Sequence, residues 1–234
     1  MSEFAVKICV TMISLNIFLN TIIDFINNQK STLIIFKLLF CLLISFFTFF
    51  FFFFLGYYIC LLFLITFEIV SFNSDFLYKD TSDKIQFQIL IGLTVVFFSI
   101  SLALCYITSI IMLTYFFTGI NKMKSKSWRN GDAIFQVINT ESFGNEKLSE
   151  LIYHKTNKQK IISWSLILFQ FTFPICVLNS KICIIYLIIG FVFHFFNMII
   201  LKLHNFFWVF ISTYPCIYIM SLKIESFLEV LLFN

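Results

Sequence analysis

Charged side chains are scarce in this chain. Only 12% of its 234 residues are Asp, Glu, Lys or Arg, whereas about a quarter of the residues of a soluble domain are charged. Hydrophobic residues make up 60% of the sequence, and the mean hydropathy is +0.97. This composition excludes an ordinary soluble domain. It predicts an all-α, polytopic transmembrane helix bundle of about seven spans, give or take one.

Common ligand-binding and catalytic motifs are missing as well. The seven cysteines lie in apolar runs and form neither CxxC nor a Cys/His ligand spacing, so we interpret them as small hydrophobic side chains, with no disulfide framework and no metal site. There is no internal repeat, glycine-rich phosphate loop, GxSxG or HExxH. No basic patch is interleaved with exposed aromatics, which argues against nucleic acid as a partner. The first apolar run lacks a basic flank and a cleavage site, so we expect a retained helix.

Long apolar runs take the place of such motifs. A span needs roughly 20 apolar residues. Residues 32–72 are twice that length and are expected to divide near 56–58. Residues 85–119 predict either two short helices turning near 103–106 or one long tilted helix. The other predicted spans are 4–27, 161–179, 182–201 and 206–222. Pro174 is expected to kink the second of these, a tight turn precedes the third, and the fourth contains Pro215. A short amphipathic tail follows at 223–234.

The longest polar segment, residues 121–160, separates the two apolar halves. It holds eight Lys/Arg against four Asp/Glu, which by the positive-inside rule predicts a cytoplasmic loop. Apolar residues recur at helical spacing within 133–138 and again within 148–152. These patterns predict two short amphipathic helices on the membrane surface. The preceding apolar helix is expected to end at Gly119, just before Lys122.

A few ionisable side chains fall at or near membrane depth, where such groups are costly and functional by default. Lys122 is the first candidate, because a poorly solvated lysine is able to act as a base. The alternative is an interfacial anchor shared with Lys124 and Lys126. Glu68 lies within about a turn of a polar loop, which favours an anchoring role.

His194 and Asn197 are the second candidate pair. They are three residues apart in an apolar span and therefore share one helical face. They either line a polar site inside the bundle or form hydrogen bonds that hold helices together. His154 and His204 fall in polar segments and are expected to be solvated.

The candidate residues lie within two patterns that resemble a known family. The run Tyr115-Phe116, Gly119, Lys122, Trp128, Gly131 is similar to the YF-x-x-G-x-x-K…W-x-x-G signature of the HTTM superfamily. Phe193-His194-Phe195-Phe196-Asn197, followed by Phe206-Phe207 and Tyr214-Pro215, resembles the F-H-x-x-N helix of that family and the helix after it. The superfamily contains the vitamin K-dependent γ-carboxylases and bacterial relatives, among them sporulation-delaying-protein-B-like membrane proteins.

The resemblance implies one integral membrane domain over residues 1–234, with its signatures within 70–220. It implies that Lys122 corresponds to the carboxylase base that deprotonates a reduced quinone, and that His194 and Asn197 line the same cavity. A reduced quinone is thus the cofactor that the resemblance suggests. Family topology would place this cavity towards the outer face, in contrast to the cytoplasmic loop that the charge rule predicts.

The chain departs from the carboxylases in two respects. It has no histidine before His154, and with its last residue at Asn234 we expect no large soluble domain of the kind that binds their peptide substrate. We therefore expect it to resemble the short bacterial members, in a bacterial cytoplasmic membrane. These imply a helper or enzyme in the modification, maturation or export of a small secreted peptide. The alternatives are a non-catalytic peptide-binding or immunity protein, and carboxylase-like chemistry with a quinone.

Overall fold

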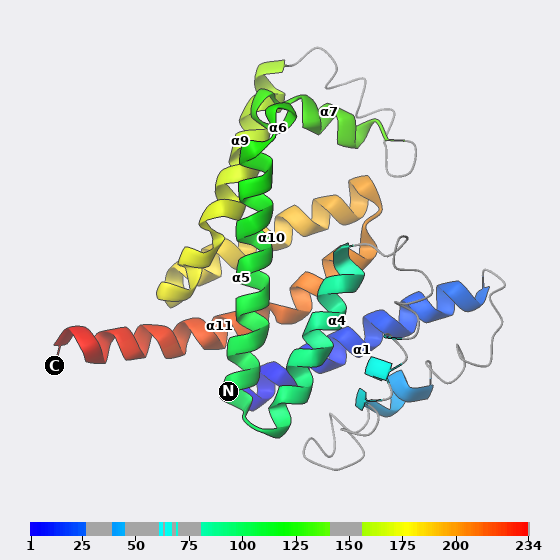
Figure 1. Ribbon diagram of the computed structural model, residues 1–234, viewed down its shortest axis with the longest axis vertical. Coiled ribbons are helices and arrows are strands. Elements are labelled where there is room, and N and C mark those ends of the chain that lie inside the picture. The colour runs from blue at the N-terminus through cyan, green and yellow to red at the C-terminus, as the bar shows by residue number, and fades with distance from the viewer. Residues whose placement is uncertain are drawn as a thin grey trace. The chain divides into compact units, whose positions relative to one another are not determined.

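The computed structural model describes residues 1–26, 39–44, 61–62, 64–66, 69, 81–140 and 156–233 (Figure 1). All regular elements in these residues are helical, which confirms the all-α prediction. Five of the helical stretches described are long and apolar enough to cross a membrane. These are Ser2–Ile22, Ile100–Lys124, Asn157–Leu178, Ser180–Leu201 and His204–Leu232. Most of residues 32–72, Glu68 included, lies outside the described residues, so a total near seven stays a prediction.

Contacts divide the chain into two units. The first contains Met1–Ile110 and Trp208–Met220, and the second contains Ile111–Phe207 and Ser221–Asn234. The assignment of residues 1–234 to one domain of the HTTM type stays a prediction.

The first unit contains α1 (Ser2–Ile26), α4 (Thr81–Thr94), the 3₁₀ turn η1 (Val95–Phe97) and the beginning of α5 (Ile100–Lys124). Asn16 of α1 donates its side-chain amide to Gln86 Oε1 of α4 at 2.8 Å, and both side chains are buried. Gly92 gives room for the ring of Tyr106, because a Cβ at Gly92 would lie 2.7 Å from Cδ1 of that ring.

Residues 85–119 form two helical segments rather than one, and the break falls earlier than predicted. The chain turns at residues 98–99, not at 103–106. Ser99 ends the turn by accepting two amide protons: its carbonyl binds the Ala103 N–H at 3.1 Å and its hydroxyl lies 3.4 Å from the Leu102 nitrogen. A serine at a helix start satisfies backbone donors that the first turn leaves unpaired.

The prediction that the apolar helix ends at Gly119 is wrong. Helix α5 continues to Lys124, so Lys122 lies in its last turn. Gly119 lies within the helix and does not end it. Its lack of a side chain instead allows close packing. A Cβ at this position would lie 2.6 Å from the backbone nitrogen of Phe171, on the neighbouring helix.

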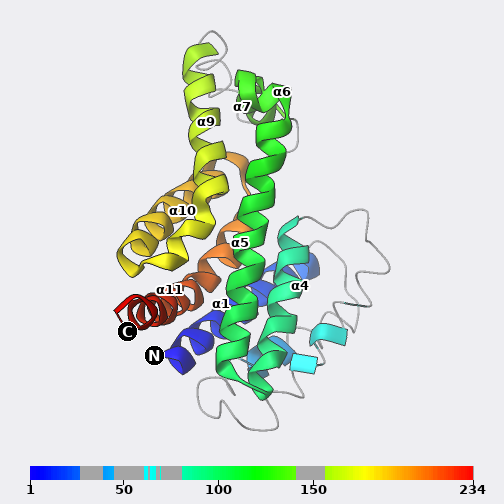
Figure 2. The same cartoon turned by 60° about the vertical axis from the view of Figure 1, so that its left-hand side comes forward.

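Two short helices follow α5 in the second unit, α6 (Lys126–Asn130) and α7 (Asp132–Ile138), and both pack against α9 (Thr156–Thr172). Figure 2 shows them beside the first turns of α9. Ala133, Ile134 and Ile138 form the buried face of α7, so the first amphipathic helix predicted for the polar segment exists. Its apolar face covers another helix, and the second predicted helix lies outside the described residues.

Pro174 marks the change from α9 to the 3₁₀ segment η2 (Phe173–Leu178), as expected for a residue that lacks a backbone N–H. The predicted tight turn is centred on Asn179, whose Oδ1 accepts the Lys181 and Ile182 N–H groups at the start of α10 (Ser180–Leu201). Lys202 ends α10 in the left-handed region, with φ 56°. The separate tail at 223–234 was predicted wrongly, because α11 (His204–Phe233) runs on through Pro215 as one helix.

Candidate functional site

A hydrogen bond between Tyr115 and His194 joins α5 to α10. The Tyr115 hydroxyl lies 2.6 Å from His194 Nε2, and both residues are only 2% exposed. The imidazole tautomer decides which of the two groups donates. A buried polar pair of this kind is expensive to break in an apolar surrounding, so it fixes the orientation of the imidazole.

Aromatic side chains surround this pair. The Tyr115 ring stacks on Phe173 with centroids 3.9 Å apart and meets Phe169 edge-on at 5.7 Å. On the α10 side, Phe193 lies edge-on to His194 at 4.9 Å. These contacts leave the phenol and imidazole few alternative positions, because aromatic rings pack as rigid bodies.

Tyr115, Gly119 and Lys122 share one face of α5. At 3.6 residues per turn, the three positions fall within about 60° of one another, and Lys122 lies roughly 10 Å along the axis from Tyr115. Gly119 places no side chain between them. Its close approach to the Gln170 and Phe171 backbone brings α9 directly against this face.

Lys122 is half-buried and lies over the indole of Trp128. Its Nζ is 4.2 Å from the centre of the ring, within the range of a cation–π contact. Lys122 lies on the same face of α5 as Tyr115, the hydrogen-bond partner of His194, about two turns further along the helix. That Lys122 and His194 form one site stays a prediction.

Helix α9 holds Trp128 in this position by binding the end of α6. The hydroxyl of Ser163 donates to the Trp128 carbonyl, and the Trp164 indole N–H donates to the Arg129 carbonyl at 3.2 Å. Gly131 then ends α6 with φ 94°, and a Cβ there would lie 2.6 Å from the Lys160 backbone nitrogen. The Trp128-x-x-Gly131 spacing therefore has a structural reason: the turn needs a left-handed residue without a side chain.

Asn197, the third predicted site residue, lies one turn after His194 on α10 and is half-buried. Its backbone carbonyl accepts the Leu203 N–H at 3.3 Å and helps to close the end of the helix. Within the residues described, its side chain has no hydrogen-bond partner. A role for Asn197 in the site stays a prediction.

Gln170 of α9 is a polar residue that the sequence analysis missed. It is 4% exposed, and its Oε1 has no hydrogen-bond partner among the described residues. Its backbone lies against Gly119, and the preceding residue, Phe169, packs on Tyr115. The signal that could have revealed it is a single amide in the otherwise apolar run 166–171.

Neither family models nor curated proteins nor solved structures yield a match to this chain. The HTTM resemblance therefore depends on the two residue patterns alone. Within the described ranges, no group of three or more His, Cys, Asp or Glu side chains is placed to hold a metal ion.

Proposed function

We propose that this chain is an integral membrane protein of the HTTM type that takes part in the modification, maturation or export of a small secreted peptide. In this proposal Lys122 is the base, and His194 and Asn197 line the site. The observation that supports it best is the buried Tyr115–His194 hydrogen bond on the same face of α5 as Lys122.

The chemistry of the site supports a catalytic reading. Polar and ionisable groups are expensive inside apolar helices and mark functional sites by default. Lys122 supplies an amine that takes up or releases a proton, and Tyr115 holds His194 in one orientation before any substrate arrives. Such preorganisation lowers the cost of aligning reacting groups.

A reduced quinone is the cofactor that the resemblance implies, and one feature of the site fits it. A hydroquinone carries two hydroxyl donors, and Gln170 Oε1 is a buried acceptor without a partner among the described residues. In this reading Gln170 would bind one hydroxyl and Lys122 would take a proton. When bound, such a group would supply the reducing equivalents for reaction with oxygen.

A second candidate function is non-catalytic binding of a peptide, as in an immunity protein. The contact between Lys122 and Trp128 favours it, because an ammonium group over an indole is stabilised in its charged form. Lys122 would then stay protonated in its contact with Trp128 and take no direct part in binding the peptide.

The decisive experiment compares the secreted peptides of cells with and without the gene by mass spectrometry. The deletion strain is complemented with wild type, Lys122→Met, Asn197→Leu or the control Lys124→Met, which alters an exposed lysine of the same helix turn. We expect the deletion to change the mass or amount of one secreted peptide, and Lys124→Met to restore it.

The variants separate the two functions. If Lys122→Met is expressed normally but does not restore the secreted peptide, the result supports Lys122 as the catalytic base. Restoration by Lys122→Met together with failure of Asn197→Leu supports non-catalytic binding. An unchanged set of secreted peptides in the deletion strain overturns both.

A further inference from the structure

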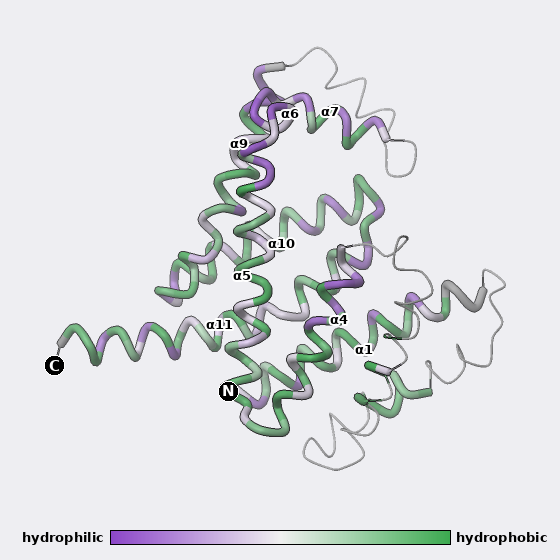
Figure 3. The backbone as a smooth tube through the Cα atoms, in the orientation of Figure 1, coloured by the Kyte–Doolittle hydropathy of each residue, from purple (hydrophilic) through white to green (hydrophobic). Residues whose placement is uncertain are grey.

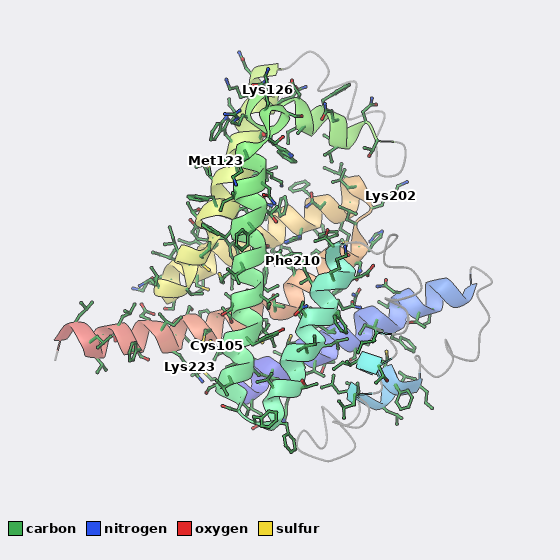
Figure 4. All side chains as sticks on the ribbon, viewed as in Figure 1. Cys105, Met123, Lys126, Lys202, Phe210 and Lys223 are labelled. Atoms are coloured by element: carbon green, nitrogen blue, oxygen red, sulfur yellow. The ribbon has the colours of Figure 1, made fainter. Side chains whose placement is uncertain are left out.

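Five exposed basic side chains gather where α5 ends, α6 lies and α9 begins. We call this group the basic ledge. Its members are Lys124, Lys126, Arg129, Lys158 and Lys160. Figure 3 shows the hydrophilic colour concentrated at this end of α5 and α9, and Figure 4 labels Lys126 there.

The fold brings these side chains together from positions up to 36 residues apart. Helix α6 contacts α9, and Gly131 lies against the Lys160 backbone. The Ser163 bond to the Trp128 carbonyl holds Arg129 beside the first turns of α9. The ledge is therefore built by packed helices and not by a run of adjacent residues.

Among the described residues, the ledge carries a positive charge that no ion pair neutralises. None of its five members has an ion pair within the described residues, and the only acidic residue in 121–140 and 156–164 is Asp132. Residues 141–155 add three acidic and two basic residues. By sequence, the whole segment 121–160 has eight basic residues against four acidic ones, so its net charge is positive.

The position of the ledge points to lipid. Two candidate membrane spans, Ile100–Lys124 and Asn157–Leu178, meet it with their polar ends. Trp128 and Trp164 lie at the same level, and tryptophan is enriched at membrane–water interfaces. Basic side chains at the polar ends of spanning helices are expected at the depth of the lipid headgroups, where anionic phosphates are concentrated.

We infer that the basic ledge binds the phosphate groups of anionic phospholipids. Lysine and arginine donate hydrogen bonds to phosphate oxygens, and the ledge supplies five such residues from three helices. A bound lipid would bridge the end of α5 and the start of α9, beside Lys122 but without contact to it in this proposal. The inference does not depend on the peptide function proposed above.

Native mass spectrometry of the purified full-length protein tests this. The protein is titrated with phosphatidylglycerol or with phosphatidylcholine of the same acyl chains, and inorganic phosphate is added in a parallel series. We expect at least tenfold tighter binding of phosphatidylglycerol, and no displacement of it by equimolar phosphate. Equal affinity of the two lipids for the wild-type protein would overturn the inference without any variant.

A charge-matched pair of variants locates the binding. Lys126→Gln with Lys158→Gln removes two ledge charges, and we expect a roughly tenfold loss of affinity for phosphatidylglycerol. Lys181→Gln with Lys202→Gln removes two exposed charges at the ends of α10 and should leave the affinity within twofold. An equal loss in both pairs means that total charge and not the ledge attracts the lipid, which also overturns the inference.

Discussion

The Tyr115 hydroxyl and His194 Nε2 lie 2.6 Å apart although 79 residues separate them in the chain. Tyr115→Phe removes this bond with little change in shape. We expect a loss of about 1–3 kcal/mol in stability, because buried His194 loses this hydrogen bond. Thermal unfolding in detergent measures it. The control Tyr106→Phe removes a partly buried hydrogen bond to Gln88 and should lower the stability less. If Tyr115→Phe lowers the stability by the same amount or less, the prediction is wrong.

Gly119→Ala tests the contact between α5 and α9. The added methyl would lie 2.6 Å from the Phe171 nitrogen, so the helices must separate. Overpacking of this kind costs about 1–3 kcal/mol. Thr118→Ala, one residue away and half-buried, serves as the control in the same unfolding assay. A fully tolerated alanine at Gly119 would show that the helices do not pack this closely.

The contact between Lys122 and Trp128 is measurable as a coupling energy. A double-mutant cycle of Lys122→Met and Trp128→Leu should give about 0.5–2 kcal/mol, the range of a cation–π contact from exposed to desolvated sites. Unfolding free energies of the two single variants and the double variant supply the cycle. Additive effects would mean that the ammonium group does not interact with the indole.

Gln170 and Gln86 provide a contrast between an unpaired and a paired buried amide. Gln170→Leu removes a carbonyl oxygen that has no partner among the described residues, so we expect unchanged or higher stability together with loss of peptide processing. Gln86→Leu instead leaves the Asn16 amide without this acceptor and should destabilise by about 1–3 kcal/mol. A destabilised Gln170→Leu variant would indicate a structural role for that residue.

Glu225 of α11 caps the beginning of α10. Its carboxylate accepts hydrogen bonds from Asn179 Nδ2 at 2.6 Å and from the Ser180 N–H at 3.1 Å. Glu225→Ala should therefore lower the unfolding temperature. The matched control is Glu229→Ala, an exposed carboxylate one turn further along the same helix. Equal unfolding temperatures in the two variants would show that the cap contributes nothing.

Sequence patterns predicted the long apolar helices well, because the mean hydropathy over about 20 residues identifies segments that are able to span a membrane. They also placed Lys122 and Trp128 in one short segment. They could not pair Tyr115 with His194, since no local signal connects residues on different helices. Gly119 misled the prediction, because a glycine that permits close packing and one that ends a helix look the same in a sequence.

The contacts of α9 with α6 and α7 have a consequence for the segment that joins them. Residues 141–155 connect α7 to α9, yet these two helices already pack on each other, and Ser163 and Trp164 bind α6. A connection between ends that are held together adds little to stability when its length changes, because the closure cost grows slowly with length. We therefore expect a tag inserted within 141–155 to change the unfolding temperature little.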